Sequence, residues 1–90
     1  MADDPFRLEF SASQVALFRQ VLAGASPAVI DAGERMVQGE VVHRRDVEAV
    51  VEVLSAAWAA EDSAHGHTPR EMQIDELIAI AYQRAHDFYD

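Results

Sequence analysis

The sequence predicts an all-α protein, a compact four-helix domain that occupies the whole chain. Three observations predict this fold. Apolar residues recur at helical spacing in four segments, two of those segments open on a capping residue followed by proline, and one segment is apolar around most of its circumference. We expect the helices at about residues 13–23, 27–38, 45–61 and 69–88.

The first two helices have clear end signals. Ser11, followed three residues later by Gln14, matches a capping box, and Gly24 is the expected left-handed cap at the end of the first helix. Ser26 and the proline after it open the second helix, and Gly39 is expected to stop it. Gly33 falls on the apolar side of the second helix, where it would allow a close approach.

The third helix is the one around which we expect the others to pack. One broad apolar stripe follows helical spacing, and a second stripe of smaller residues lies beside it. The first stripe holds Val47, Val50, Val51, Leu54 and Trp58, and the second holds Ala49, Val53, Ala56 and Ala60. A helix with so little polar surface needs neighbours on several sides, from its own chain or from a second copy.

The fourth helix carries the strongest local start signal. Thr68 caps it, proline follows, and Glu71 stands where it would close a capping box. Its expected core face is flanked by two tyrosines and holds Ile74, Leu77, Ile78, Ala81, Ala85 and Phe88.

The remaining segments are predicted to be less regular. Residues 1–5 are expected to fray, and residues 62–68 are expected to form a polar loop. Residues 6–10 alternate apolar and polar side chains, which is typical of a short half-buried strand. Such a strand needs a partner, either residues 40–43 or the same strand of a second chain.

Composition narrows the functional classes. The chain has 90 residues, half of them hydrophobic, and no cysteine, so disulfides and cysteine chemistry are excluded. Seven arginines against sixteen carboxylates give a net charge of −9, which disfavours nucleic acid and favours a protein partner with a basic surface. No apolar run suggests a membrane span or a secretory signal, so we expect a cytoplasmic protein. Arginine without lysine, beside much alanine and valine, suggests a bacterial origin.

Two groups of residues could carry function. The first is Glu61, Asp62, His65 and His67, whose imidazoles and carboxylates could ligate zinc, nickel or copper. The sequence favours a solvated loop there, with His65 and His67 as weak metal candidates, and predicts neither a cofactor nor catalytic residues. The second group is a tentative partner surface of Trp58, Met72, Ile80, Phe88 and Tyr89. Trp58, Phe88 and Tyr89 could instead close one end of the core.

Residues 6–38 also carry a resemblance to a known family. A short strand, a helix, the linking residues 24–30 and a second helix resemble the ribbon-helix-helix layout of bacterial repressors and antitoxins. That resemblance implies a dimer whose paired strands bind in the major groove of DNA. It also implies that the start of the second helix, near Ser26, contacts a DNA phosphate. The strand carries Arg7 and Glu9 where basic or amide side chains are usual, and no basic residue lies near Ser26.

Three functions follow from these observations. The leading one is a small acidic, non-enzymatic regulatory or adaptor protein that acts through protein–protein contact, with a homodimer expected. Antitoxin, immunity and inhibitor roles fit this description. The alternatives are a degenerate ribbon-helix-helix regulator that binds DNA and a metal-responsive protein that uses the loop of His65 and His67.

Overall fold

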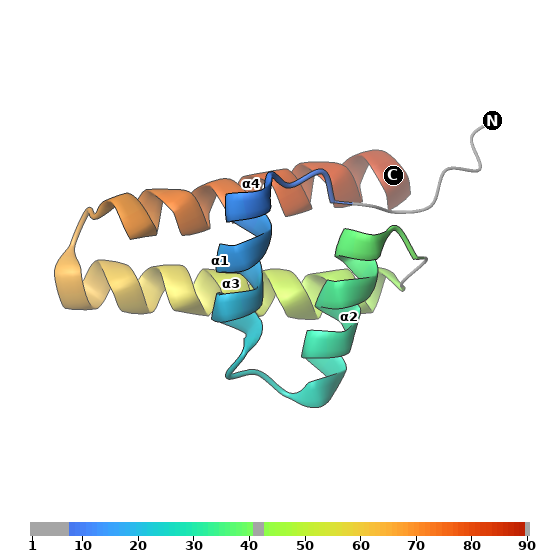
Figure 1. The fold of residues 1–90 in the computed structure, drawn as a ribbon, viewed down its shortest axis with the longest axis horizontal. Helices are drawn as coiled ribbons and strands as arrows, with labels where there is room; N and C mark the ends of the chain where they lie inside the picture. The colour runs from blue at the N-terminus through green and yellow to red at the C-terminus, as the bar shows by residue number, and fades with distance from the viewer. Residues whose placement is uncertain (1–7, 41–42, 90) are drawn as a thin grey trace.

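A computed structural model of the chain describes residues 8–40 and 43–89, and this part of the chain forms four α-helices. The helices are α1 (Ala12–Leu22), α2 (Pro27–Gln38), α3 (Arg44–His65) and α4 (Pro69–Tyr89). The two long helices, α3 and α4, run side by side as a hairpin, and α1 and α2 lie across it (Figure 1). The predicted all-helical, four-helix architecture is therefore confirmed.

The third helix lies at the centre of the packing, as its apolar stripe predicts. It packs against α1, α2 and α4, and its residues Val47, Val50 and Leu54 are fully buried. The second predicted stripe is less covered, because Ala49 and Val53 are only half-buried and Ala56 is exposed. One chain thus covers Val47, Val50 and Leu54 of the main stripe without a second copy, whereas Val51 and Trp58 are half-buried and part of the helix circumference stays open.

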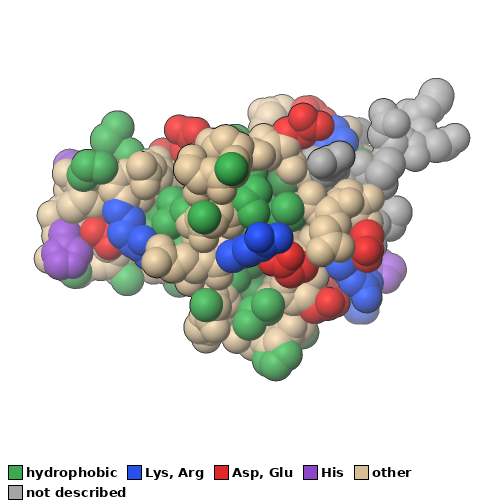
Figure 2. Space-filling model, in the orientation of Figure 1, with side chains coloured by type: hydrophobic (Ala, Val, Ile, Leu, Met, Phe, Trp, Pro, Cys, Tyr) green, Lys and Arg blue, Asp and Glu red, His purple; other side chains and the backbone are tan. Residues whose placement is uncertain are grey.

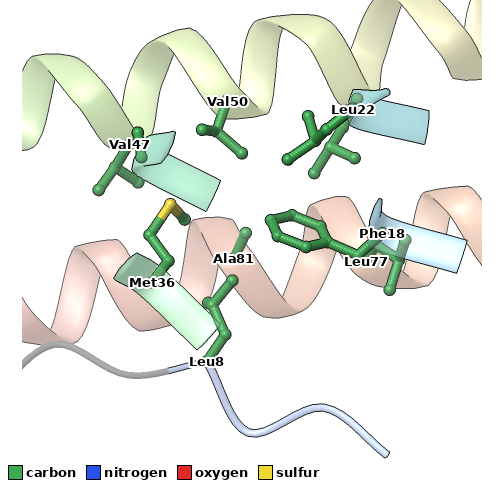
Figure 3. Packing of buried hydrophobic residues seen from close by; sticks show 10 residues of the cluster. Leu8, Phe18, Leu22, Met36, Val47, Val50, Leu77 and Ala81 are labelled. Carbon is green, nitrogen blue, oxygen red and sulfur yellow. The ribbon is translucent and has the colours of Figure 1, made fainter. Parts of the chain in front are cut away.

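The hydrophobic core joins side chains from all four helices and from the segment before α1 (Figure 3). Phe18 and Leu22 of α1 and Met36 of α2 point into the space between α3 and α4. The buried members are Leu8, Phe18, Leu22, Ala32, Met36, Val47, Val50, Leu54, Leu77 and Ala81. Burial of side chains from segments far apart in the sequence therefore stabilises the short helices, which would have little stability alone.

The helix ends follow their sequence signals with two exceptions. The Ser11 side chain accepts from the Gln14 amide and the Gln14 side chain accepts from the Ser11 amide, which completes the predicted box. Gly39 takes the left-handed conformation expected at the end of α2, with φ at 79°. The prediction for Gly24 was wrong: α1 ends at Leu22, its cap Ala23 stays right-handed, and the Ala25 amide bonds to the Leu22 carbonyl at 2.9 Å.

The second exception is the start of α4. Thr68 caps α4 as predicted. The Glu71 side chain does not close the capping box, because its Oε1 atom bonds to His67 and its Oε2 atom has no partner among the described residues.

The predicted N-terminal strand is a further correction. Residues 8–10 form no strand, and neither Glu40 nor His43 pairs with them as one. The Leu8 amide instead donates to the Met36 carbonyl at 2.8 Å, one of the carbonyls that the end of α2 leaves without a helical partner. Burial of Leu8 and the contact of Phe10 with Phe18 fix this segment without a sheet. Residues 6, 7, 41 and 42 of the proposed pairing lie outside the described residues.

The predicted loop at residues 62–68 is another correction. The helix α3 continues to His65, because residues 62–65 include neither glycine nor proline and nothing in them stops a helix. The first breaker is Gly66, with φ at 73°, whose amide donates to the Asp62 carbonyl at 2.8 Å. The connection to α4 is therefore only residues 66–68, which brings the end of α3 close to the start of α4.

Polar side chains join α1 to α2 and α1 to α4. The Arg19 guanidinium of α1 donates two hydrogen bonds to the Glu34 carboxylate of α2, at 2.8 and 3.1 Å. Arg70 of α4 donates to the Gln20 side-chain oxygen at 2.9 Å. These groups are exposed, so each pair contributes little free energy, but together they fix how the helices are aligned.

Close packing of α1 on α2 depends on Gly33. A Cβ atom added there would overlap Leu22 Cδ1 and would lie 3.3 Å from Phe18 Cε2. We expect Gly33→Ala to lower the free energy of unfolding by about 1–2 kcal/mol, because overpacking costs about 1–3 kcal/mol and the gain in helix propensity returns up to about 1 kcal/mol. Denaturant unfolding measures this difference.

Gly24→Ala is the matched control. Nothing lies within 4 Å of a Cβ atom at Gly24, and its φ angle is not positive, so alanine fits there without strain. We expect this variant to be as stable as the unmodified protein or slightly more stable. A Gly33→Ala variant as stable as Gly24→Ala would contradict the packing of Leu22 and Phe18 described here.

Candidate functional site

A groove with an apolar floor lies between α3 and α4. Its volume is about 290 Å³, just under the range of roughly 300–1,000 Å³ typical of small-molecule pockets. No residue of α1 or α2 lines it in the part of the chain that the structure describes. The lining residues are Arg44, Val47, Glu48, Val51 and Glu52 of α3 with Tyr82, Ala85 and His86 of α4.

Helical spacing explains how these residues come to one groove. On α3, Arg44, Glu48 and Val51 recur every three or four residues, so they share one face beside the buried face. On α4, Tyr82 and Ala85 have the same relation. Two adjacent faces of neighbouring helices therefore leave a channel where their side chains do not interlock.

The groove combines an apolar interior with an acidic margin. Val47 is fully buried, Val51 and Ala85 are half-buried, and the Tyr82 side chain stands 68% exposed. Glu48 and Glu52 are exposed, and the Arg44 guanidinium lies 3.8 Å from the Glu48 carboxylate. A partner would find apolar contact area here beside carboxylates that can accept hydrogen bonds.

The aromatic residues predicted at the end of α4 pack inward. Phe88 and Tyr89 lie against the hydrophobic core, and their rings meet edge to face with centroids 4.9 Å apart. Burial raises the pKa of the Tyr89 hydroxyl, the charge of Asp46 raises it further, and the charge of Arg44 lowers it. Tyr89 thus lies by the start of α3, where it helps to close this end of the bundle.

The other predicted partner residues are dispersed. Met72 is 67% exposed, and Trp58 and Ile80 are half-buried. Ile80 borders a shallow hollow with Ala79 and polar side chains of α4, which is separate from the groove. The structure therefore brings none of the five predicted residues into the groove lining, and Tyr82, which we expected at the edge of the core, is the aromatic residue that lies there.

The turn between α3 and α4 holds a second cluster of functional groups. The exposed imidazole of His67 lies with its Nδ1 atom 3.0 Å from a carboxylate oxygen of Glu71. Glu71 is one helical turn further on and is buried. His65, the other predicted candidate, is exposed in the last turn of α3 and does not join them.

Helix capping places Glu71 in this cluster. The Thr68 hydroxyl accepts a hydrogen bond from the Glu71 amide and donates one to the Glu61 carboxylate, each at 3.0 Å. Arg70 also lies against Glu61, with 3.6 Å between the charged atoms. Glu61, a predicted metal candidate, is thus engaged by Thr68 and Arg70, while Asp62 and His67 converge with Glu71. Glu71 was not among the metal candidates predicted from the sequence, although its spacing of four residues from His67 places the two side chains on one helical face.

Charges around His67 favour its protonated form. The hydrogen bond to Glu71 raises the pKa of the imidazole, and the negative charges of Glu71 and Asp62 raise it further. This part of the molecule appears in Figure 2 at the end that holds the α3–α4 turn, where histidine, arginine and acidic side chains lie together.

Comparison of the chain with family models, with curated proteins and with solved structures finds no match. Among the described helices, none has both the length and the apolar character that crossing a bilayer requires.

The His67 pKa gives a direct test of the turn geometry. We expect NMR titration to place it above the usual 6.5, and Glu71→Gln to bring it back toward that value. Because the folded pKa is raised, protonated His67 stabilises the fold fully below the unfolded pKa near 6.5, and this contribution is lost as the pH rises through the folded pKa. An unchanged His67 titration in Glu71→Gln would contradict the pairing.

Proposed function

We propose that the chain is a non-enzymatic regulatory or adaptor protein that binds a basic protein partner through the groove between α3 and α4. The observation that carries the proposal is the groove itself, an apolar channel with exposed glutamates at its margin. Its volume of about 290 Å³ suits side chains projected by a partner better than it suits enclosure of a small molecule.

Charge and geometry define the partner that fits. A net charge of −9 attracts a basic surface over a long range and repels nucleic acid. Within the groove, Val51 and Tyr82 offer apolar contact area, and Glu52 can pair with lysine or arginine, as can Glu48 when it exchanges its contact with Arg44. An amphipathic helix whose apolar stripe is flanked by basic residues has this complementary pattern.

Other roles receive less support from the fold. A homodimer is not needed to cover Val47, Val50 and Leu54 of α3, and two copies that each carry −9 repel one another. For the DNA-binding alternative, the Ser26 hydroxyl caps α2 by accepting from the Val29 amide, and residues 8–10 form no strand. Antitoxin, immunity and inhibitor roles stay within the proposal, since each acts by binding another protein.

A synthetic amphipathic helical peptide tests the groove. We expect a peptide with a leucine stripe flanked by lysines to shift the NMR signals of Val51, Tyr82 and Ala85, and to bind less tightly as salt is raised. Tyr82→Ala should weaken binding about tenfold, equal to about 1.4 kcal/mol, because it removes the exposed aromatic contact.

Met72→Ala is the matched control, since Met72 and Tyr82 are almost equally exposed on the same helix and only Tyr82 lines the groove. A peptide with glutamate in place of lysine should not bind. Equal weakening by both variants, or signal shifts spread over the whole surface, would contradict the assignment. Sedimentation at two concentrations tests whether a second copy of the chain occupies the groove instead. A dimer that Tyr82→Ala dissociates would show that it does.

A further inference from the structure

Three potential metal-ligating side chains converge where α3 turns into α4. One carboxylate oxygen each from Asp62 and Glu71 and a ring nitrogen of His67 all lie within 4.8 Å of one another. They come from the last turns of α3, from the connection and from the first turn of α4. The groove described above involves the opposite end of the hairpin, so this cluster is a separate feature (Figure 1).

Glu71 is a buried carboxylate of which one oxygen lacks a hydrogen-bond partner among the described residues. Its side chain is only 5% exposed, and the oxygen in question is Oε2. A buried carboxylate oxygen without a partner loses its hydration and gains nothing in exchange. Glu71 is also the only buried charged side chain among the described residues. A positive ion at the cluster would compensate this loss.

We propose that Asp62, His67 and Glu71 form a binding site for a divalent first-row transition metal ion, with Zn²⁺ as the reference ion. One imidazole and two carboxylates are a ligand set that zinc accepts, and the two carboxylates balance the charge of the ion. The proposed set keeps Asp62 and His67 of the four candidates predicted from the sequence, adds Glu71 and omits Glu61 and His65. It does not depend on the partner-binding groove.

Zinc binding would open the His67–Glu71 pair slightly and draw the third ligand inward by up to about 1.5 Å. Ligands about 2.0–2.1 Å from a tetrahedral zinc ion stand about 3.3 Å from one another. The Nδ1 atom of His67 and Oε1 of Glu71 are already 3.0 Å apart, and the third ligand lies within 4.8 Å. Because the His67 side chain is 87% exposed, the fourth position faces solvent and would hold water.

The contacts of the neighbouring residues leave Asp62, His67 and Glu71 free to bind a metal ion together. Thr68 and Arg70 engage the neighbouring Glu61, which keeps that carboxylate out of the cluster. The Thr68 cap fixes the first turn of α4 and thereby the backbone of Glu71. Gly66 takes the positive φ that turns His67 back toward Asp62. Groups that support ligands in this way raise metal affinity in known sites.

Protonated His67 is the competing partner for Glu71. An imidazolium would neutralise the carboxylate without any metal, and a metal ion must displace that proton to bind. The two arrangements differ in a measurable way. A metal site binds more tightly as the pH rises and releases a proton on binding, whereas an ion pair alone shows neither effect.

Calorimetric titration with Zn²⁺ at pH 6 and pH 8, on the full chain, tests the site. We expect one ion per chain, with binding about tenfold or more tighter at pH 8. His67→Ala, Asp62→Asn and Glu71→Gln should each weaken Zn²⁺ binding about tenfold or more. His65→Ala is the matched control and should leave the affinity unchanged, since His65 does not join the cluster. The absorption of bound Co²⁺ provides a second readout of the coordination geometry.

Folding of the variants is controlled by circular dichroism. His67→Ala changes an exposed side chain and should fold normally, so it keeps the test decisive even if Glu71→Gln alters stability. The proposal is overturned if His67→Ala binds Zn²⁺ as tightly as the unmodified protein. It is also overturned if His65→Ala weakens binding equally, which would indicate adventitious coordination by surface histidines.

Discussion

The structure depends on burial of one stripe of α3 beneath α1 and α2. Val50 and Leu54 lose all contact with water there, together with Phe18 of α1 and Met36 of α2. Burial of side chains of this size contributes about 1.5–3 kcal/mol each, more than any exposed ion pair in the molecule. This contact holds the two short helices in place. So does Gly33, because without a side chain it lets Leu22 and Phe18 pack closely against α2.

That arrangement covers only part of the long hairpin. Because α1 and α2 supply none of the residues that line the groove, the neighbouring faces of α3 and α4 leave an apolar channel between exposed glutamates. The channel is a consequence of having two short helices and two long ones. A bundle of four equal helices would have more side chains available to fill it. The proposed partner would supply the missing apolar contact.

The opposite end of the hairpin is organised by capping. Once Thr68 fixes the first turn of α4, Glu71 is drawn into the interior beside His67 and Asp62. A carboxylate in that position has to find positive charge, and it can do so with a protonated imidazole or with a metal ion. The short connection of residues 66–68 permits either solution, because it brings ligands from both helices together.

The sequence by itself determined the helical class, the central place of Val47, Val50 and Leu54, and the helix starts at Ser11, Ser26 and Thr68. Those features follow from periodicity and capping, which act within a few residues. The sequence predicted the wrong environment for residues 8–10 and 62–65. Only the tertiary structure decided that Leu8 bonds to the end of α2, that Tyr82 lines a groove and that Glu71 is buried next to His67. These outcomes depend on which helix covers which face, and local spacing carries no information about the lateral placement of one helix on another.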